Sequence, residues 1–156
     1  MIAALAPLDD NEATISWLSA IERRVAEPQP LLEAFADDAQ RLLSAQFESE
    51  GIALLGASWA PLAASTLAAK EAAGLDLRIL HATLRLRDSL ERTTADTVRR
   101  ITSDSATVGT TVPYAGYHQT GTTRMPQRRI VAVRPQDRRR WRDAVLTWAV
   151  SGEVAV

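Results

Sequence analysis

The sequence predicts an α+β fold in which long amphipathic helices pack on a small antiparallel sheet. Residues 31–50 and about 136–150 carry apolar side chains at the helical period, and β-branched residues gather at about 92–110. Helices, a hairpin, a further strand and a last helix follow one another, an order typical of α+β domains. A chain of 156 residues is the usual size of one domain. We therefore divide it into a helical extension, 1–30, and a single α+β domain, 31–156.

Two helices are predicted in the first third of the chain. The first begins at Asp9–Glu12, where side-chain oxygens can cap it and negative charge suits the helix dipole. Pro28 and Pro30 end it, because proline disfavours helix in the residue before it. Gly51 ends the second. The predicted apolar face of the first helix comprises Ile15, Leu18, Ile21 and Val25. That of the second comprises Leu32, Phe35, Ala39, Leu42, Leu43, Gln46 and Phe47, with the acids opposite.

The rest of the chain predicts shorter elements. Residues 51–62 look irregular, with an exposed Trp59–Pro61 segment, and short helices follow at 63–73 and up to about Leu90. A hairpin at about 92–110 turns at residues 103–105. Tyr114–Gln119 looks like an ordered loop, Gly121–Thr123 forms a further loop, and about 129–133 looks like one more strand. The stripe of the last helix, which Pro135 starts, comprises Trp141, Ala144, Val145, Trp148 and Ala149.

Composition excludes several classes of protein. The hydrophobic fraction of 46% with 24% charged residues argues against disorder throughout. With no cysteine, the chain cannot form a disulfide scaffold, a thiolate zinc finger, an iron–sulfur cluster or a cysteine nucleophile. Apolar runs are far shorter than the ~20 residues that span a bilayer, and the N-terminus lacks the basic region of a signal peptide. We expect a soluble, internal protein with no membrane contact.

Charge is balanced overall but unevenly distributed along the chain. There are 18 basic and 19 acidic residues. Residues 1–50 carry ten acids against three bases, whereas residues 121–156 carry eight arginines against three acids. Such opposite ends suggest complementary faces that meet within one chain or between copies. The neighbouring acids Asp9–Asp10 and Asp37–Asp38 point to different helix faces, so we expect them in solvent rather than sharing a proton.

No catalytic, metal-binding or cofactor-binding residues are predicted. The chain has no phosphate-binding glycine motif, no HExxH and no GxSxG. Its two histidines, His81 and His118, have no carboxylates at ligand spacing. An enzyme that uses His118 as a base with Tyr114 or Tyr117 stays a minor alternative. We expect a protein that is not an enzyme and needs no cofactor.

A cluster of arginines supports a second alternative, a small nucleic-acid-binding protein. Arg138, Arg139 and Arg142 lie on the predicted last helix, and Arg124 and Arg128 are nearby in sequence. Such side chains bind phosphate backbones. The isoelectric point of about 6.1 lacks the basic bias of most nucleic-acid-binding domains, so we expect at most incidental DNA contact.

Short motifs from residue 47 onward add a resemblance to a known family. In chain order they are Phe47–Gly51, Trp59–Leu62 with Thr66 and Lys70, Ile79–Leu80, Thr83–Leu90, Val108–Thr110, Pro113–Gly121 and Met125–Arg128. Their order and spacing resemble the phage virion-morphogenesis or tail-completion family, the Mu-like group of small head–tail joining proteins. Leu84 stands where that family pattern has Gly, and residues 1–30 lie outside the resemblance.

The resemblance implies a structural protein of a tailed phage or phage-like particle. It would act at the neck or tail end in tail completion and head–tail joining, as a ring, with other neck, connector or tail-tube proteins as partners. It would be found in the virion, and in the host cytoplasm during assembly. Tyrosine and arginine are favoured at interface hot spots. Our interface candidates are Trp59, Pro61, Tyr114, Tyr117, His118, Gln119, Arg124, Arg128, Arg138, Arg139 and Arg142. For Trp59 and Tyr114, core packing is the open alternative.

Overall fold

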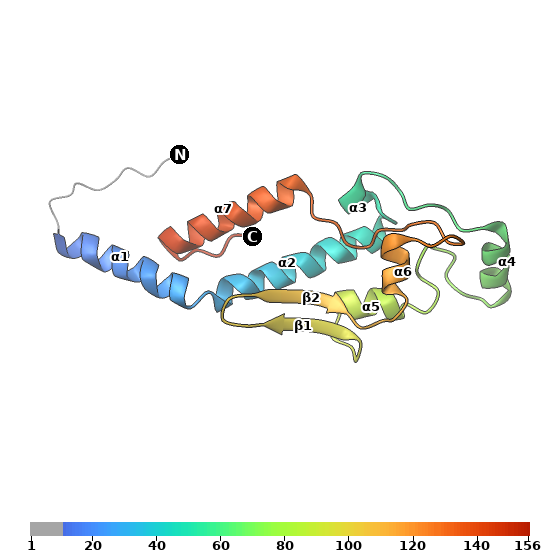
Figure 1. Cartoon of the computed structure of the whole chain (residues 1–156), viewed down its shortest axis with the longest axis horizontal. Coiled ribbons are helices and arrows are strands. Elements are labelled where there is room, and N and C mark those ends of the chain that lie inside the picture. Colours follow the sequence, from blue (N-terminus) through green and yellow to red (C-terminus); the bar gives the residue numbers. More distant parts are fainter. Residues whose placement is uncertain (1–10) are drawn as a thin grey trace.

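The computed structural model describes residues 11–156 and shows an elongated α+β molecule built along one central helix, α2 (Figure 1). In chain order the elements are α1 (Asn11–Ala26), α2 (Gln29–Glu48), α3 (Ile52–Leu55), α4 (Ala64–Ala72), α5 (Arg85–Glu91), β1 (Thr97–Ile101), β2 (Ala106–Thr110), α6 (Ala115–Thr120) and α7 (Pro135–Ser151). The hairpin and α7 both pack on α2. The predicted fold class is confirmed, whereas the helix start at residues 9 and 10 lies outside the described residues. In the described part of the chain, no helix is long and apolar enough to cross a membrane.

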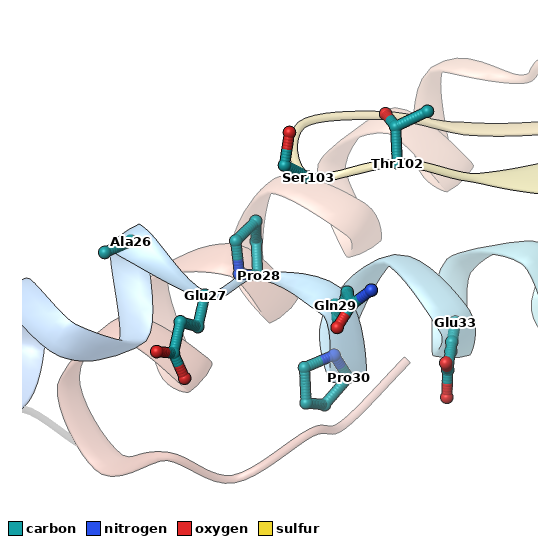
Figure 2. A pocket seen from close by; sticks show the side chains of 8 residues that line it. All are labelled: Ala26, Glu27, Pro28, Gln29, Pro30, Glu33, Thr102 and Ser103. Carbon is teal, nitrogen blue, oxygen red and sulfur yellow. The ribbon is translucent and has the colours of Figure 1, made fainter.

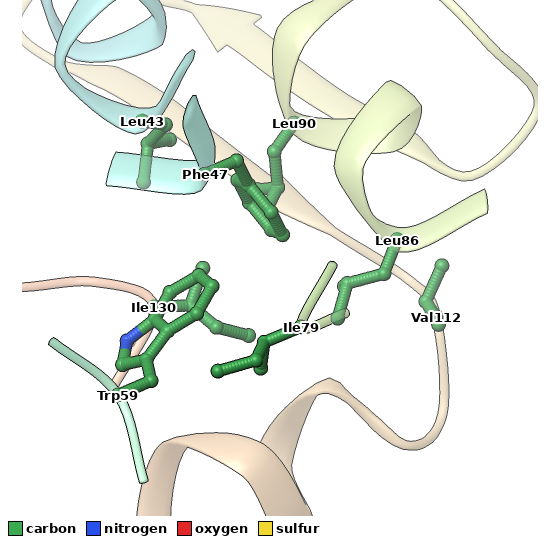
Figure 3. Packing of buried hydrophobic residues seen from close by; sticks show 8 residues of the cluster. All are labelled: Leu43, Phe47, Trp59, Ile79, Leu86, Leu90, Val112 and Ile130. Atoms are coloured by element: carbon green, nitrogen blue, oxygen red, sulfur yellow. The ribbon is translucent and has the colours of Figure 1, made fainter. Parts of the chain in front are cut away.

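The apolar core forms around the C-terminal half of α2 (Figure 3). Its buried residues are Leu43, Phe47, Trp59, Ile79, Leu86, Leu90, Val112 and Ile130. Phe47 is completely buried, and its ring meets Trp59 edge-on at a centroid distance of 5.6 Å. The expected exposure of Trp59 is therefore wrong: only 4% of the residue is exposed. Its indole Nε1 donates to the carbonyl of Arg129 at 2.8 Å, which satisfies the one polar atom of a buried ring.

Several backbone positions near the core have left-handed conformations, among them Gly51 and Leu84. Gly51 has φ +109°, and a Cβ there would lie 2.8 Å from Cδ1 of Trp59, so the α2–α3 junction needs glycine. Leu84, immediately before α5, has φ +59°. The family pattern has Gly at the position of Leu84, and the left-handed backbone supplies the physical reason for that preference.

The hairpin forms as predicted, and the final strand does not. β1 pairs antiparallel with β2, from Thr97 opposite Thr110 to Ile101 opposite Ala106.

The predicted strand at 129–133 is wrong, because a side chain takes the place of a neighbouring strand. Gln119 Oε1 accepts from the amides of Ile130 and Val131 at 2.9 and 3.0 Å, and its Nε2 donates to the carbonyl of Val131 at 2.8 Å. This segment is therefore hydrogen-bonded without being part of the sheet.

The last helix, α7, confirms its prediction and docks on α2 through a buried carboxylate. Asp38 accepts from the guanidinium of Arg140 and, at 2.8 Å, from Trp141 Nε1. The expectation that Asp38 faces solvent is therefore wrong, since the residue is buried. Asp37 is exposed and pairs with Arg99 of β1 at 2.6 Å. Part of the acidic first third thus meets the basic last third within one chain.

Helix α1 (Asn11–Ala26) ends before Pro28 as predicted, but its apolar face is not covered. None of its residues is buried, and Ile15, Leu18 and Val25 are exposed. It packs chiefly on α7. There Arg24 donates to the carbonyls of Ala149 and Val150 at 3.0 and 2.8 Å. These carbonyls end α7, where a cation is favourable.

Candidate protein-interface site

Five of the eleven interface candidates line one pocket of about 790 Å³, which we call the basic pocket. Its walls come from four stretches of chain, namely 61–70, 80–86, 114–118 and 124–128. The candidates in its lining are Pro61, Tyr114, His118, Arg124 and Arg128. Helices α4 and α6, which contribute to these walls, lie at the end of the molecule opposite α1 (Figure 1).

Two buried cations line the basic pocket. Lys70 and Arg128 are only 7% and 6% exposed. Lys70 Nζ donates to the carbonyl of Arg78 at 2.7 Å. The guanidinium of Arg128 donates to the carbonyls of Ala60 and Pro61 at 2.8 and 2.9 Å. No acidic residue is in the lining. Burial lowers the pKa of Arg128, because a charge loses hydration there. Backbone dipoles hold these cations without neutralising them.

His118 forms one wall together with Tyr114. The segment expected to be a loop forms the short helix α6, which places the His118 ring edge-on to Tyr114 at a centroid distance of 6.0 Å. Burial, and secondly the charge of Arg128, lower the pKa of His118. The ring is therefore neutral at pH 7. Its Nδ1 is buried and has no hydrogen-bond partner among the described residues.

Three other interface candidates, Trp59, Gln119 and Tyr117, do not line the basic pocket. Trp59 belongs to the core, so its side chain is not available to a partner. Gln119 is occupied with the backbone of residues 130 and 131. Tyr117 is 60% exposed on α6, where a partner could reach it.

The remaining arginine candidates, Arg138, Arg139 and Arg142, lie on α7. The arginine candidates therefore do not form a single surface, because Arg124 and Arg128 line the basic pocket. Arg138, Arg139 and Arg142 are exposed, and Arg142 pairs with Asp143 at 2.7 Å. Arg128 belongs to the basic pocket, where it faces carbonyls. DNA contact by these side chains stays a prediction.

Sequence reasoning missed Lys70 as a site residue. The signal was present, because Thr66 and Lys70 follow Trp59–Leu62 in the family motif and both line the pocket. What the sequence could not show is that this lysine, the only one in the sequence, is buried and lines the same pocket as Arg128.

A second hollow, of about 530 Å³, is acidic (Figure 2). Its lining includes Glu27 at the α1–α2 junction, Glu33 of α2, and Thr102 and Ser103 at the tip of the hairpin. No cation is in its lining. The two hollows thus carry opposite charge.

Residues 11–156 contain no group of three or more His, Asp or Glu side chains that could hold a metal ion.

Comparison with known families identifies the chain. A model of the phage virion morphogenesis family matches residues 9–149. The chain belongs to the phage virion morphogenesis family. Searches of curated proteins and of solved structures found no match. Since the match begins at residue 9, the expectation that residues 1–30 lie outside the resemblance is wrong from that point on, and α1 is part of the family region. Membership supports a structural or assembly role associated with the virion.

Proposed function

We propose that this member of the phage virion morphogenesis family completes the tail and joins it to the head, as a ring of identical subunits at the neck or tail end. The observation that carries the proposal is the family match over 9–149, which covers nearly all of the described helices and strands. The proposed role is performed by surfaces, with no catalytic step and no cofactor. Other neck, connector or tail-tube proteins are the proposed partners.

The shape and charge of the molecule support a role in assembly. The acidic hollow adjoins the junction of α1 and α2, and the basic pocket lies beside α4 and α6. Complementary potentials steer partners together and select their orientation. A subunit whose two ends differ in chemistry is suited to head-to-tail contact with copies of itself and to different neighbours on either side.

Deletion of the gene in the phage or prophage that encodes the chain tests the proposal. We expect lysates in which electron microscopy shows filled heads and tails as separate particles, with joined particles restored when the wild-type chain is supplied from a plasmid. Joined, full-length particles in the deletion strain would contradict the proposed role.

Cosedimentation of the purified protein with phage tails tests the same proposal in vitro. Purified protein is expected to cosediment with tails isolated from the deletion strain and to increase their joining to purified heads. Failure to bind either tails or heads, by a protein shown to be folded, would contradict a place at this junction.

A further inference from the structure

Helix α1 presents an apolar stripe that contains a carboxylate. Ile15, Leu18, Glu22 and Val25 are spaced three or four residues apart, so they share one face of the helix. All four are exposed, and 52% of Leu18 is accessible. The half-buried Ile21 and the bonds of Arg24 to the end of α7 hold a neighbouring face of the helix. The stripe is thus available while α1 stays in place.

The basic pocket has the opposite chemistry. Its apolar wall includes Leu62, Leu80 and Met125, and its charged groups are Lys70, Arg124 and Arg128. Burial of a cation costs free energy unless an acid or strong acceptor compensates it. Within residues 11–156, no carboxylate pairs with Lys70 or Arg128, and none lines the pocket. An occupant with aliphatic side chains and a carboxylate therefore fits it.

One chain cannot bring these two surfaces together. In the view along the shortest axis, α1 is at one end of the long axis and α4 and α6 are at the other (Figure 1). A contact between two different surfaces of identical subunits is heterologous, and it forms a ring when its rotation closes.

We propose that α1 of one copy docks in the basic pocket of the next copy. The aliphatic stripe covers the apolar wall, and the Glu22 carboxylate approaches Arg124 at the rim and the buried cations behind it. The inference rests on the self-association in the proposed function and names its contact surfaces.

Charge reversal tests this contact through Glu22→Arg and Arg124→Glu. Both positions are exposed, so the variants should fold like the wild type, which circular dichroism and thermal unfolding would confirm. Sedimentation of the full chain over a concentration series at low salt measures self-association. We expect each single variant to weaken it at least tenfold. Glu27→Arg, the same charge change at an exposed position that follows directly on α1 and lies off the stripe, is the matched control and should leave self-association unchanged.

Mixing gives the sharpest result. In an equimolar mixture of Glu22→Arg and Arg124→Glu, opposite charges face each other again at every contact between the two variants. Association should therefore return, as it should in the double variant. If the wild type associates but the single variants associate equally well, or if mixing restores nothing, this contact is wrong while self-association stands. A wild type that stays monomeric at every concentration would instead overturn both the contact and the proposed ring.

Discussion

The C-terminal half of α2 and helix α1 are both amphipathic, yet they are held in very different ways. Phe47 of α2 is completely buried among apolar side chains from five other stretches of the chain. Helix α1 has no buried residue and is anchored to α7 by Arg24. Amphipathicity alone therefore does not show which helix forms the core. One apolar face stabilises the fold, and the other is exposed.

Removal of the core ring should produce the largest effect. Phe47→Ala leaves a cavity beside Trp59 and His81 and should lower the free energy of unfolding by ~3–5 kcal/mol. Urea unfolding followed by tryptophan fluorescence measures it. A loss below ~1 kcal/mol would mean that this half of α2 is not the centre of the fold.

Removal of the negative charge of Asp38, which is buried between α2 and α7, should lower the free energy of unfolding by an intermediate amount. Asp38→Asn keeps the size of the side chain but weakens the bonds to Arg140 and Trp141, and should cost ~1–3 kcal/mol. Asp37→Asn is the matched control, because its pair with Arg99 is exposed and should contribute no more than ~1 kcal/mol. Equal losses at the two positions would contradict the distinction between a buried and a solvated acid.

Low pH should reduce the stabilising contribution of Asp137, which lies in the first turn of α7. Hydrogen bonds from Arg134 hold the pKa of Asp137 below its usual value, so Asp137 binds protons less readily in the folded state than in the unfolded state. Its contribution is complete above the unfolded pKa of ~3.9 and is lost as pH falls through the folded pKa. The difference in stability between wild type and Asp137→Asn should therefore shrink below about pH 4. Urea unfolding at pH 6 and pH 3 measures it, and a constant difference would contradict this role.

The smallest effect should come from the exposed face of α1. Leu18→Ala removes an apolar side chain that is half accessible and should change stability by less than ~0.5 kcal/mol in the monomer. The same variant should weaken self-association if the stripe forms a subunit contact. A large loss of monomer stability would show that α1 belongs to the core.

The sequence predicted helix spans better than it predicted environments. The periodicity and turn residues located α1, α2, α7 and the hairpin, because those signals are local. It failed where distant groups meet: Asp38 is buried only because Arg140 and Trp141 reach it, and residues 129–133 are not a strand because Gln119 takes up their amides. Arg128 was predicted as a site residue, whereas the burial of Lys70 in the lining of the same pocket depends on the folded chain.

Hydrogen exchange of the backbone amides of α1 and of residues 43–47 tests the central claim most directly. In dilute monomer, α1 should exchange through local opening, many times faster than residues 43–47, which open only with global unfolding. At concentrations where the protein assembles, the amides of α1 should gain protection while those of 43–47 stay unchanged. Equal protection of the two helices in the monomer, or no gain in α1 on assembly, would contradict the account.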